Sequence, residues 1–263
     1  MTFPNVLGAE LRKAALLPAV WAAVLAAFAG SVLIALLNSF SARTAIASGR
    51  SEQLGLTSPF ELGYAAIPLV GTVGAVVLGV VVIGSEYTAN SADAGGGRQI
   101  TATLAAAPHR VRLLSAKALT VAAAVVATAA AAIPTSVGVA RLVMGGTAPE
   151  TVSAEEALHR FLGAALYWTL MGLIAFAVTV LTRSGTIPLI VLTVNSSLVS
   201  FSLLLTRLTP LAHWLPDTAG RRLFGEWAAV EGGLDTGPGA LVMAAWTLGM
   251  LVVAAAVFSR RDA

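Results

Sequence analysis

The stretch LGYAAIPLVGTVGAVVLGVVVIGS, residues 62–85, contains 24 residues without one Asp, Glu, Lys or Arg. A helix needs about 20 apolar residues to cross the hydrocarbon core of a bilayer, and a charge at its centre costs about 2.5–3.5 kcal/mol. Backbone polar groups in lipid must pair within their own segment, which favours a helix. The stretch therefore predicts a membrane-spanning helix over about 62–84.

Five further windows share this freedom from charge: 14–42, 118–140, 161–182, 184–206 and 236–259. Each is long enough for one crossing and too short for two. We predict an all-α integral membrane protein, a single transmembrane domain over 1–263, with spans at about 18–38, 62–84, 118–140, 161–182, 186–206 and 239–258.

Composition excludes an ordinary soluble domain, because 57% of the residues are hydrophobic and 11% charged, against roughly 45–50% and about 25% in soluble proteins. The chain has no cysteine, which excludes disulfides and thiolate chemistry. The first window has an apolar core of more than 20 residues, longer than the 7–15 of a signal peptide. We interpret it as the first span.

An even number of spans places both termini on one side. If that side is cytoplasmic, it carries nine of the 16 basic residues, four of them within 85–117. An excess of Lys and Arg marks cytoplasmic loops. We therefore expect both termini in the cytoplasm of a multi-pass protein of the cell membrane.

Two flanking segments leave alternatives open. Residues 1–17 are either an interfacial helix, with Glu10, Arg12 and Lys13 facing water, or a polar lead-in to the first span. Residues 207–238 lie outside the cell and either re-enter the outer leaflet or rest on the membrane surface, anchored by Trp214 and Trp227.

Small residues recur every fourth position in the second span, at Gly71, Ala75 and Gly79. This spacing places them on one helix face, where they allow close helix packing.

The segment 86–117 between the second and third spans is the most informative. Glu86 and Tyr87 stand where the second span ends, a mostly small and apolar stretch follows, Pro108 interrupts it, and basic residues precede the third span. We expect a helix over 86–107 lying along the cytoplasmic face, a shape suited to docking a soluble protein.

Signatures of catalysis are missing. The sequence holds no G-x-x-x-x-G-K-[ST] phosphate loop, no H-E-x-x-H and no G-x-S-x-G motif. The charge-free windows hold no acid or base of the kind that proton-coupled carriers and ion pumps use. We predict no catalytic and no metal-binding residues, and no enzyme activity. Energy for any transport would come from a partner.

The order of motifs resembles the membrane subunits of ABC-2-type exporters. The chain has Glu86-Tyr87, then Thr103-Leu104-Ala105 with Pro108, then Ala116-Lys117-Ala118-Leu119, and it begins with Ala9-Glu10-Leu11-Arg12-Lys13. The resemblance implies a bacterial exporter in which two membrane subunits, two copies of this chain or this chain and a paralogue, pair with two copies of a cytosolic ATPase. ATP and magnesium would bind the ATPase, and this chain would bind no cofactor. Coupling to the ATPase would fall to Glu86, Tyr87, Arg98, Thr103, Leu104, Pro108, Arg110, Arg112 and Lys117.

The same resemblance assigns the central path to the second and fifth spans. Helical spacing places Thr193, Ser196, Ser197 and Ser200 on one face of the fifth span, and Asn195 opposite them with Ser202. These side chains either line a path or bond neighbouring helices, and Asn195 is the strongest candidate because a mid-span amide needs a partner. Such a path suits an amphipathic or hydrophobic drug, antibiotic, lipid or peptide.

Two other functions stay open. The chain is alternatively a membrane scaffold or sensor that docks a cytosolic partner without transport, or an enzyme acting on lipid through His213, Asp217 and Arg221. Membrane lipid is an expected partner under every interpretation, and nucleic acid under none.

Overall fold

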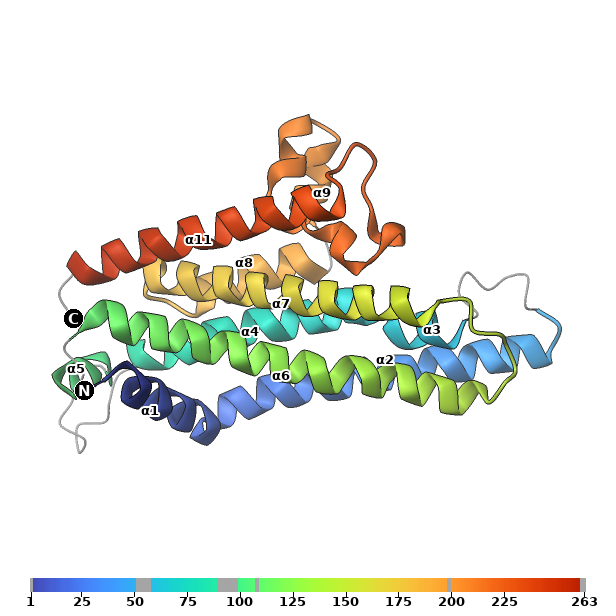
Figure 1. Ribbon diagram of the computed structural model, residues 1–263, viewed down its shortest axis with the longest axis horizontal. Coiled ribbons are helices and arrows are strands. Elements are labelled where there is room, and N and C mark those ends of the chain that lie inside the picture. The colour runs from blue at the N-terminus through green and yellow to red at the C-terminus, as the bar shows by residue number, and fades with distance from the viewer. Residues whose placement is uncertain (1, 51–57, 89–98, 107–108, 198–199, 261–263) are drawn as a thin grey trace.

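The computed structural model describes residues 2–50, 58–88, 99–106, 109–197 and 200–260, and over these ranges the chain is helical and contains no strand. The long helices lie side by side in a bundle (Figure 1). In chain order the elements are α1 (Phe3–Leu16), α2 (Pro18–Ala47), α3 (Pro59–Tyr64), η2 (Ile67–Gly71), α4 (Thr72–Gly84), η3 (Ser85–Tyr87), α5 (Gln99–Ala106), α6 (Arg110–Met144), α7 (Ala154–Thr182), α8 (Thr186–Ser197), α9 (Phe201–Thr206), η5 (Pro210–Trp214), α10 (Pro216–Ala219), η6 (Arg221–Phe224), η7 (Glu226–Ala228) and α11 (Thr236–Arg260).

Five helical stretches are long and apolar enough to cross a membrane: Pro18–Ala47, Pro59–Tyr87, Arg110–Met144, Ala154–Thr182 and Thr236–Arg260. They agree with the predicted class, an all-α membrane protein. The fifth predicted span, 186–206, differs because it is not one continuous helix. The helix α8 has 12 residues, about 18 Å at 1.5 Å per residue, and Ser200 is extended before α9 begins.

Proline sets the corner between α1 and α2. Leu17 is extended, with φ −81° and ψ 114°, because a residue that precedes proline avoids the α region. Pro18 then starts α2, where its missing N–H costs nothing. The chain therefore bends at Leu17, and α1 lies at one end of the bundle, at an angle to α2 (Figure 1) and beside the first turns of α6.

The centre of the bundle is the contact between α4 and α7. A Cβ at Gly79 would approach the carbonyl oxygen of Gly172 to 2.0 Å, and a Cβ at Gly71 would overlap the Trp168 ring. Ala75 is buried between them. Glycine at these positions lets the two backbones touch, on the face that the four-residue spacing predicts. The helices α2 and α11 leave much larger apolar faces open.

The segment between the second and third spans is not the single helix expected over 86–107. Only one turn, η3, continues α4, and Thr88 is extended. The described helix in this segment is α5, and α6 begins at Arg110, eight residues before the predicted third span. The basic residues at 110–117 thus belong to α6.

One end of the bundle gathers α1, α5 and the last turns of α11 (Figure 1). Arg110 at the start of α6 donates to the Phe258 carbonyl oxygen near the end of α11, at 3.2 Å. The short helices from η5 to η7 lie instead beside the beginning of α11, where the Trp246 indole donates to the Trp214 carbonyl oxygen at 2.8 Å. Each of these two parts of the molecule, the bundle end with α1 and α5 and the region of the short helices, contains a polar region.

Candidate functional site

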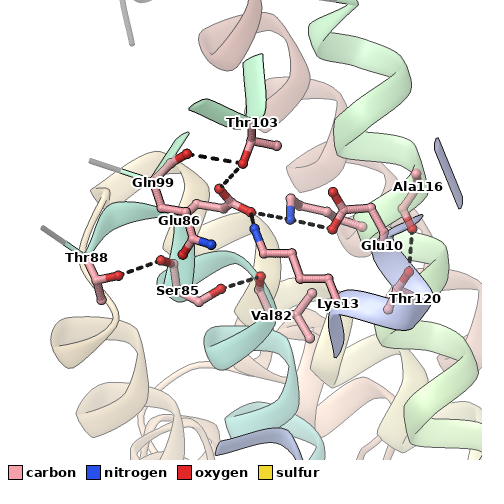
Figure 2. Close-up of polar contacts among 11 residues, drawn as sticks. Glu10, Lys13, Val82, Ser85, Glu86, Thr88, Gln99, Thr103, Ala116 and Thr120 are labelled. Atoms are coloured by element: carbon pink, nitrogen blue, oxygen red, sulfur yellow. Dashed lines mark hydrogen bonds and ion pairs between the residues drawn. The ribbon is translucent and has the colours of Figure 1, made fainter. Parts of the chain in front are cut away.

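The first polar region is a buried ion-pair cluster of Glu10, Lys13, Glu86, Thr103 and Lys117, where α1, η3, α5 and α6 meet. The Lys117 ammonium bonds Glu10 Oε2 and Glu86 Oε1, each at 2.6 Å. Lys13 bonds the same Glu86 oxygen, and the Thr103 hydroxyl donates to Glu86 Oε2 at 2.8 Å. Figure 2 shows the side chains of Glu10, Lys13, Glu86 and Thr103 turned toward one another.

Local structure places each member of the ion-pair cluster. Glu86 ends the apolar helix α4 and is carried inward by the single turn η3, so that it is completely buried. Glu10 and Lys13 are three residues apart on α1, hence on one face. Lys117 stands two turns into α6 and is 1% exposed. Thr103 comes from α5, which lies between η3 and α6 in the chain.

The cluster is balanced in charge and fully bonded at its centre. Two carboxylates face two ammonium groups, and both oxygens of Glu86 accept hydrogen bonds. A buried charge is tolerated only when it is paired and hydrogen-bonded, and losing one partner of a buried pair costs about 3–5 kcal/mol. The cluster therefore acts as one unit that fixes α1, α4, α5 and α6 relative to one another.

The predicted coupling residues do not all lie in one site. Glu86, Thr103 and Lys117 meet in the ion-pair cluster, while Tyr87 and Leu104 are partly buried against the hydrophobic core. Arg110 bonds the end of α11, and Arg112 is exposed on α6. Arg98 and Pro108 lie outside the described residues.

Sequence reasoning missed Glu10 and Lys13 as members of this site. The expectation that Glu10 faces water is wrong, because Glu10 is 6% exposed and bonds Lys117. The available signal was spacing: Val6, Glu10 and Ala14 are the buried residues of α1, and a spacing of four marks one helix face.

The second polar region is a cavity of about 320 Å³ beside the break between α8 and α9. The Asn195 amide nitrogen donates to Asp217 Oδ2 at 2.9 Å. The Asn195 amide oxygen accepts from the Ser202 hydroxyl at 3.1 Å and from the Ser202 backbone N–H at 3.3 Å. Asn195 thus joins the end of α8, the start of α9 and α10.

Walls of this polar cavity come from η2 and α4, α7, α8, α9 and the segment α10 to η7. Its polar lining residues are Thr72, Tyr167, Asn195, Ser196, Ser200, Asp217 and Arg221, and Phe224 and Trp227 add aromatic rings. The Tyr167 hydroxyl donates to the Asp217 carbonyl oxygen at 3.2 Å. The Ser196 hydroxyl is buried and has no hydrogen-bond partner among the described residues.

The expected arrangement of polar residues in the fifth span changes accordingly. Asn195 and Ser196 line the same cavity, and Ser202 bonds Asn195 directly. Placing Asn195 opposite Ser196 and Ser200 was wrong, because all three line this cavity and the backbone at Ser200 is extended. The expectation that Asn195 and Ser202 share a face agrees with the hydrogen bonds between them. Thr193 lies elsewhere, in an apolar groove between α2 and α4. The side chain of Ser197 lies outside the described residues.

The three residues of the lipid-enzyme hypothesis do not form one site. Asp217 and Arg221 line the polar cavity, whereas His213 is not among its walls. Among the described residues, no three His, Asp or Glu side chains gather as metal ligands would. Trp214 and Trp227 are each about half exposed on the segment between α9 and α11.

Comparison with known proteins identifies no family. No protein-family model matches this sequence, and no curated protein is significantly similar to it.

Proposed function

We propose that this chain is the membrane subunit of an ATP-driven exporter of the ABC-2 type, working with separate ATP-binding subunits. One observation carries the proposal: α5 is bonded to the fully buried Glu86, which two lysines tie to α1 and α6. A helix at the bundle end that is fixed to three others through a buried ion-pair cluster is suited to receive force from a soluble partner.

Force applied to α5 would pass through atoms in direct contact. Displacing Thr103 moves Glu86, and Glu86 cannot move without Lys13 and Lys117, because separating a buried pair exposes an uncompensated charge. The helices α1, α4 and α6 would then shift together. Packed interiors respond to small displacements by switching between discrete arrangements, which is how closure of the ATPase would reach the membrane helices.

The energy for transport would come from the partner. The sequence lacks a phosphate-binding loop, and its six charge-free windows contain no Asp, Glu, Lys, Arg or His through which an ion gradient could act. ATP and magnesium would bind the ATPase, two copies of which would face two membrane subunits. Both termini would lie in the cytoplasm, with the divided helices α8 and α9 completing the sixth crossing.

The polar cavity is proposed as part of the substrate path. It lies at a discontinuous helix, the kind of element that binds substrate in many transporters. Its hydroxyls, its amide and its aromatic rings suit an amphipathic molecule. The direction of transport, outward, rests on the resemblance of the sequence motifs.

Site-specific crosslinking tests this proposal. Since the chain has no cysteine, Ala102→Cys, at an exposed position of α5, introduces its only thiol. Crosslinking in native membranes, followed by purification, is expected to capture a P-loop ATPase. Thr147→Cys, exposed beyond the other end of α6, is the matched control and is expected to capture none.

The result also separates the exporter from a scaffold or sensor. If Ala102→Cys captures a soluble protein without an ATP-binding site and never an ATPase, the exporter assignment is wrong and the docking function stands. If Thr147→Cys captures the ATPase as efficiently as Ala102→Cys, α5 is not the contact.

A further inference from the structure

We propose that the polar cavity binds a zwitterionic group, an ammonium and a phosphate carried by one molecule, with Asp217 contacting the ammonium and Arg221 the phosphate. The proposal rests on the proposed function only in making this ligand the substrate. Binding itself can be measured on this chain without an ATPase.

The carboxylate of Asp217 is held in place but lacks a cation. Asp217 is 7% exposed, and its Oδ2 accepts from Asn195. Its Oδ1 accepts no hydrogen bond from any described residue, and none of the ion pairs among these residues includes Asp217. A buried carboxylate without a positive partner is costly, so a cationic ligand group would gain a prepared site.

The guanidinium of Arg221 shares the cavity without pairing with that carboxylate. Arg221 donates from Nε to the Ala228 carbonyl oxygen at 3.4 Å and forms no ion pair with a described residue. Residues four apart on one α-helix would meet. Here α10 ends at Ala219 and the tighter helix η6 begins at Arg221, so the two charges are kept separate.

Gly220, between these two helices, is fixed by its surroundings. A Cβ there would lie 2.5 Å from Met243 Sδ and 2.9 Å from the Tyr167 ring. The change of helix at this position is therefore packed tightly against α7 and α11. It holds two opposite charges apart at one cavity, an arrangement that one molecule carrying both charges would complement.

The remaining walls suit such a ligand. Aromatic faces attract ammonium groups, and Tyr167, Phe224 and Trp227 line the cavity, the first two with ring centroids 4.5 Å apart. The arginine fork matches phosphate oxygens, and the unpartnered Ser196 hydroxyl can serve another polar atom. A volume of about 320 Å³ falls at the lower end of small-molecule sites, suitable for a headgroup.

Titration calorimetry on the full chain in phosphatidylglycerol nanodiscs tests the proposal. The probe is glycerophosphoethanolamine, compared with ethanolamine, glycerol 3-phosphate and β-alanine. We expect the zwitterionic phosphate to bind at least about tenfold more tightly than each of the others, since it alone carries both an ammonium and a phosphate. Tighter binding of β-alanine, or equal binding of ethanolamine, overturns the proposal.

Matched variants assign the two contacts. Asp217→Asn keeps an acceptor for Asn195, and Arg221→Gln keeps a donor for Ala228. Each is expected to weaken probe binding about tenfold or more. Arg222→Gln is the control, because Arg222 pairs with Asp235 and Glu226 and is not among the cavity walls. Unchanged binding by a variant that elutes as the wild type on gel filtration contradicts the proposal.

Phosphatidylethanolamine added to the nanodiscs distinguishes the source of the ligand. Competition with the probe identifies a lipid headgroup, and its absence identifies a soluble zwitterion. The proposed function can fail separately: a chain that binds the probe but captures no ATPase through Ala102→Cys keeps this site and loses the exporter. A chain that captures the ATPase but does not bind the probe keeps the exporter assignment and loses this site.

Discussion

The ion-pair cluster and the polar cavity handle buried charge in opposite ways. In the cluster, each carboxylate bonds an ammonium group and Lys117 serves two of them. In the cavity, Asp217 and Arg221 both line the wall without pairing, and the Ser196 hydroxyl has no hydrogen-bond partner in the described part of the chain. A site in which every carboxylate is paired with an ammonium group gains rigidity and leaves no unpaired charge for a ligand. An unsaturated site can bind one, and its bonding is completed only then.

The largest effect is expected in the cluster, from Lys117→Met. The substitution keeps the apolar stem and leaves Glu10 and Glu86 buried without their shared cation. We expect the free energy of unfolding in detergent to fall by about 3–5 kcal/mol. Denaturant titration followed by circular dichroism measures it. Arg112→Met, exposed on the same helix, is the control and should change stability by less than about 0.5 kcal/mol.

A smaller effect is expected in the cavity, from Asn195→Ala. The variant loses the hydrogen bonds to Asp217 and to Ser202. Water in the cavity can replace part of this bonding, because the polar groups that lose Asn195 border the cavity. We expect a loss of about 1–3 kcal/mol in the same titration. If the loss equals that of Lys117→Met, the cavity is as rigid and saturated as the cluster, and the contrast drawn between them fails.

The smallest effect on stability is expected from Ser196→Ala. The hydroxyl is buried and none of the described residues bonds it, so removing it breaks no hydrogen bond to them and removes an unsatisfied polar group. We expect the midpoint of unfolding to stay the same or rise slightly, within about 0.5 kcal/mol. A loss above about 1 kcal/mol would reveal a bonded hydroxyl and a more saturated cavity.

The same contrast explains what the sequence could and could not predict. Charge exclusion located α4, α7 and α11 because bilayer energetics act on every residue locally. The glycine spacing in α4 also predicts a real packing face, since the helical period is local. Local sequence patterns could not predict the ion-pair cluster, because Glu10 bonds a lysine 107 positions away in the chain. Lys117 was predicted as a coupling residue ahead of the third span, but nothing in the sequence indicated that it is buried within α6.

The cavity escaped prediction for another reason. An uninterrupted apolar window gives no sign that the backbone becomes extended at Ser200, so helical spacing was applied across a break. Asn195 was nevertheless a sound candidate, because an amide in a membrane helix needs a partner. The identity of that partner, Asp217, depends on how α10 folds back. Residue type pointed to the site, and tertiary structure alone assembled it.

The most direct test of the central claim, that α5 transmits the work of an ATPase through Glu86, is the ratio of substrate transported to ATP hydrolysed. Thr103→Val removes only the bond to Glu86 and to its own helix. Ser259→Ala, an exposed hydroxyl bonded to its own helix at the same bundle end, is the matched control. In the complex reconstituted into vesicles, we expect Thr103→Val to retain ATP hydrolysis and to lower the ratio about tenfold, the effect of losing one hydrogen bond to a charged group, with Ser259→Ala unchanged. An unchanged ratio in Thr103→Val would contradict the account.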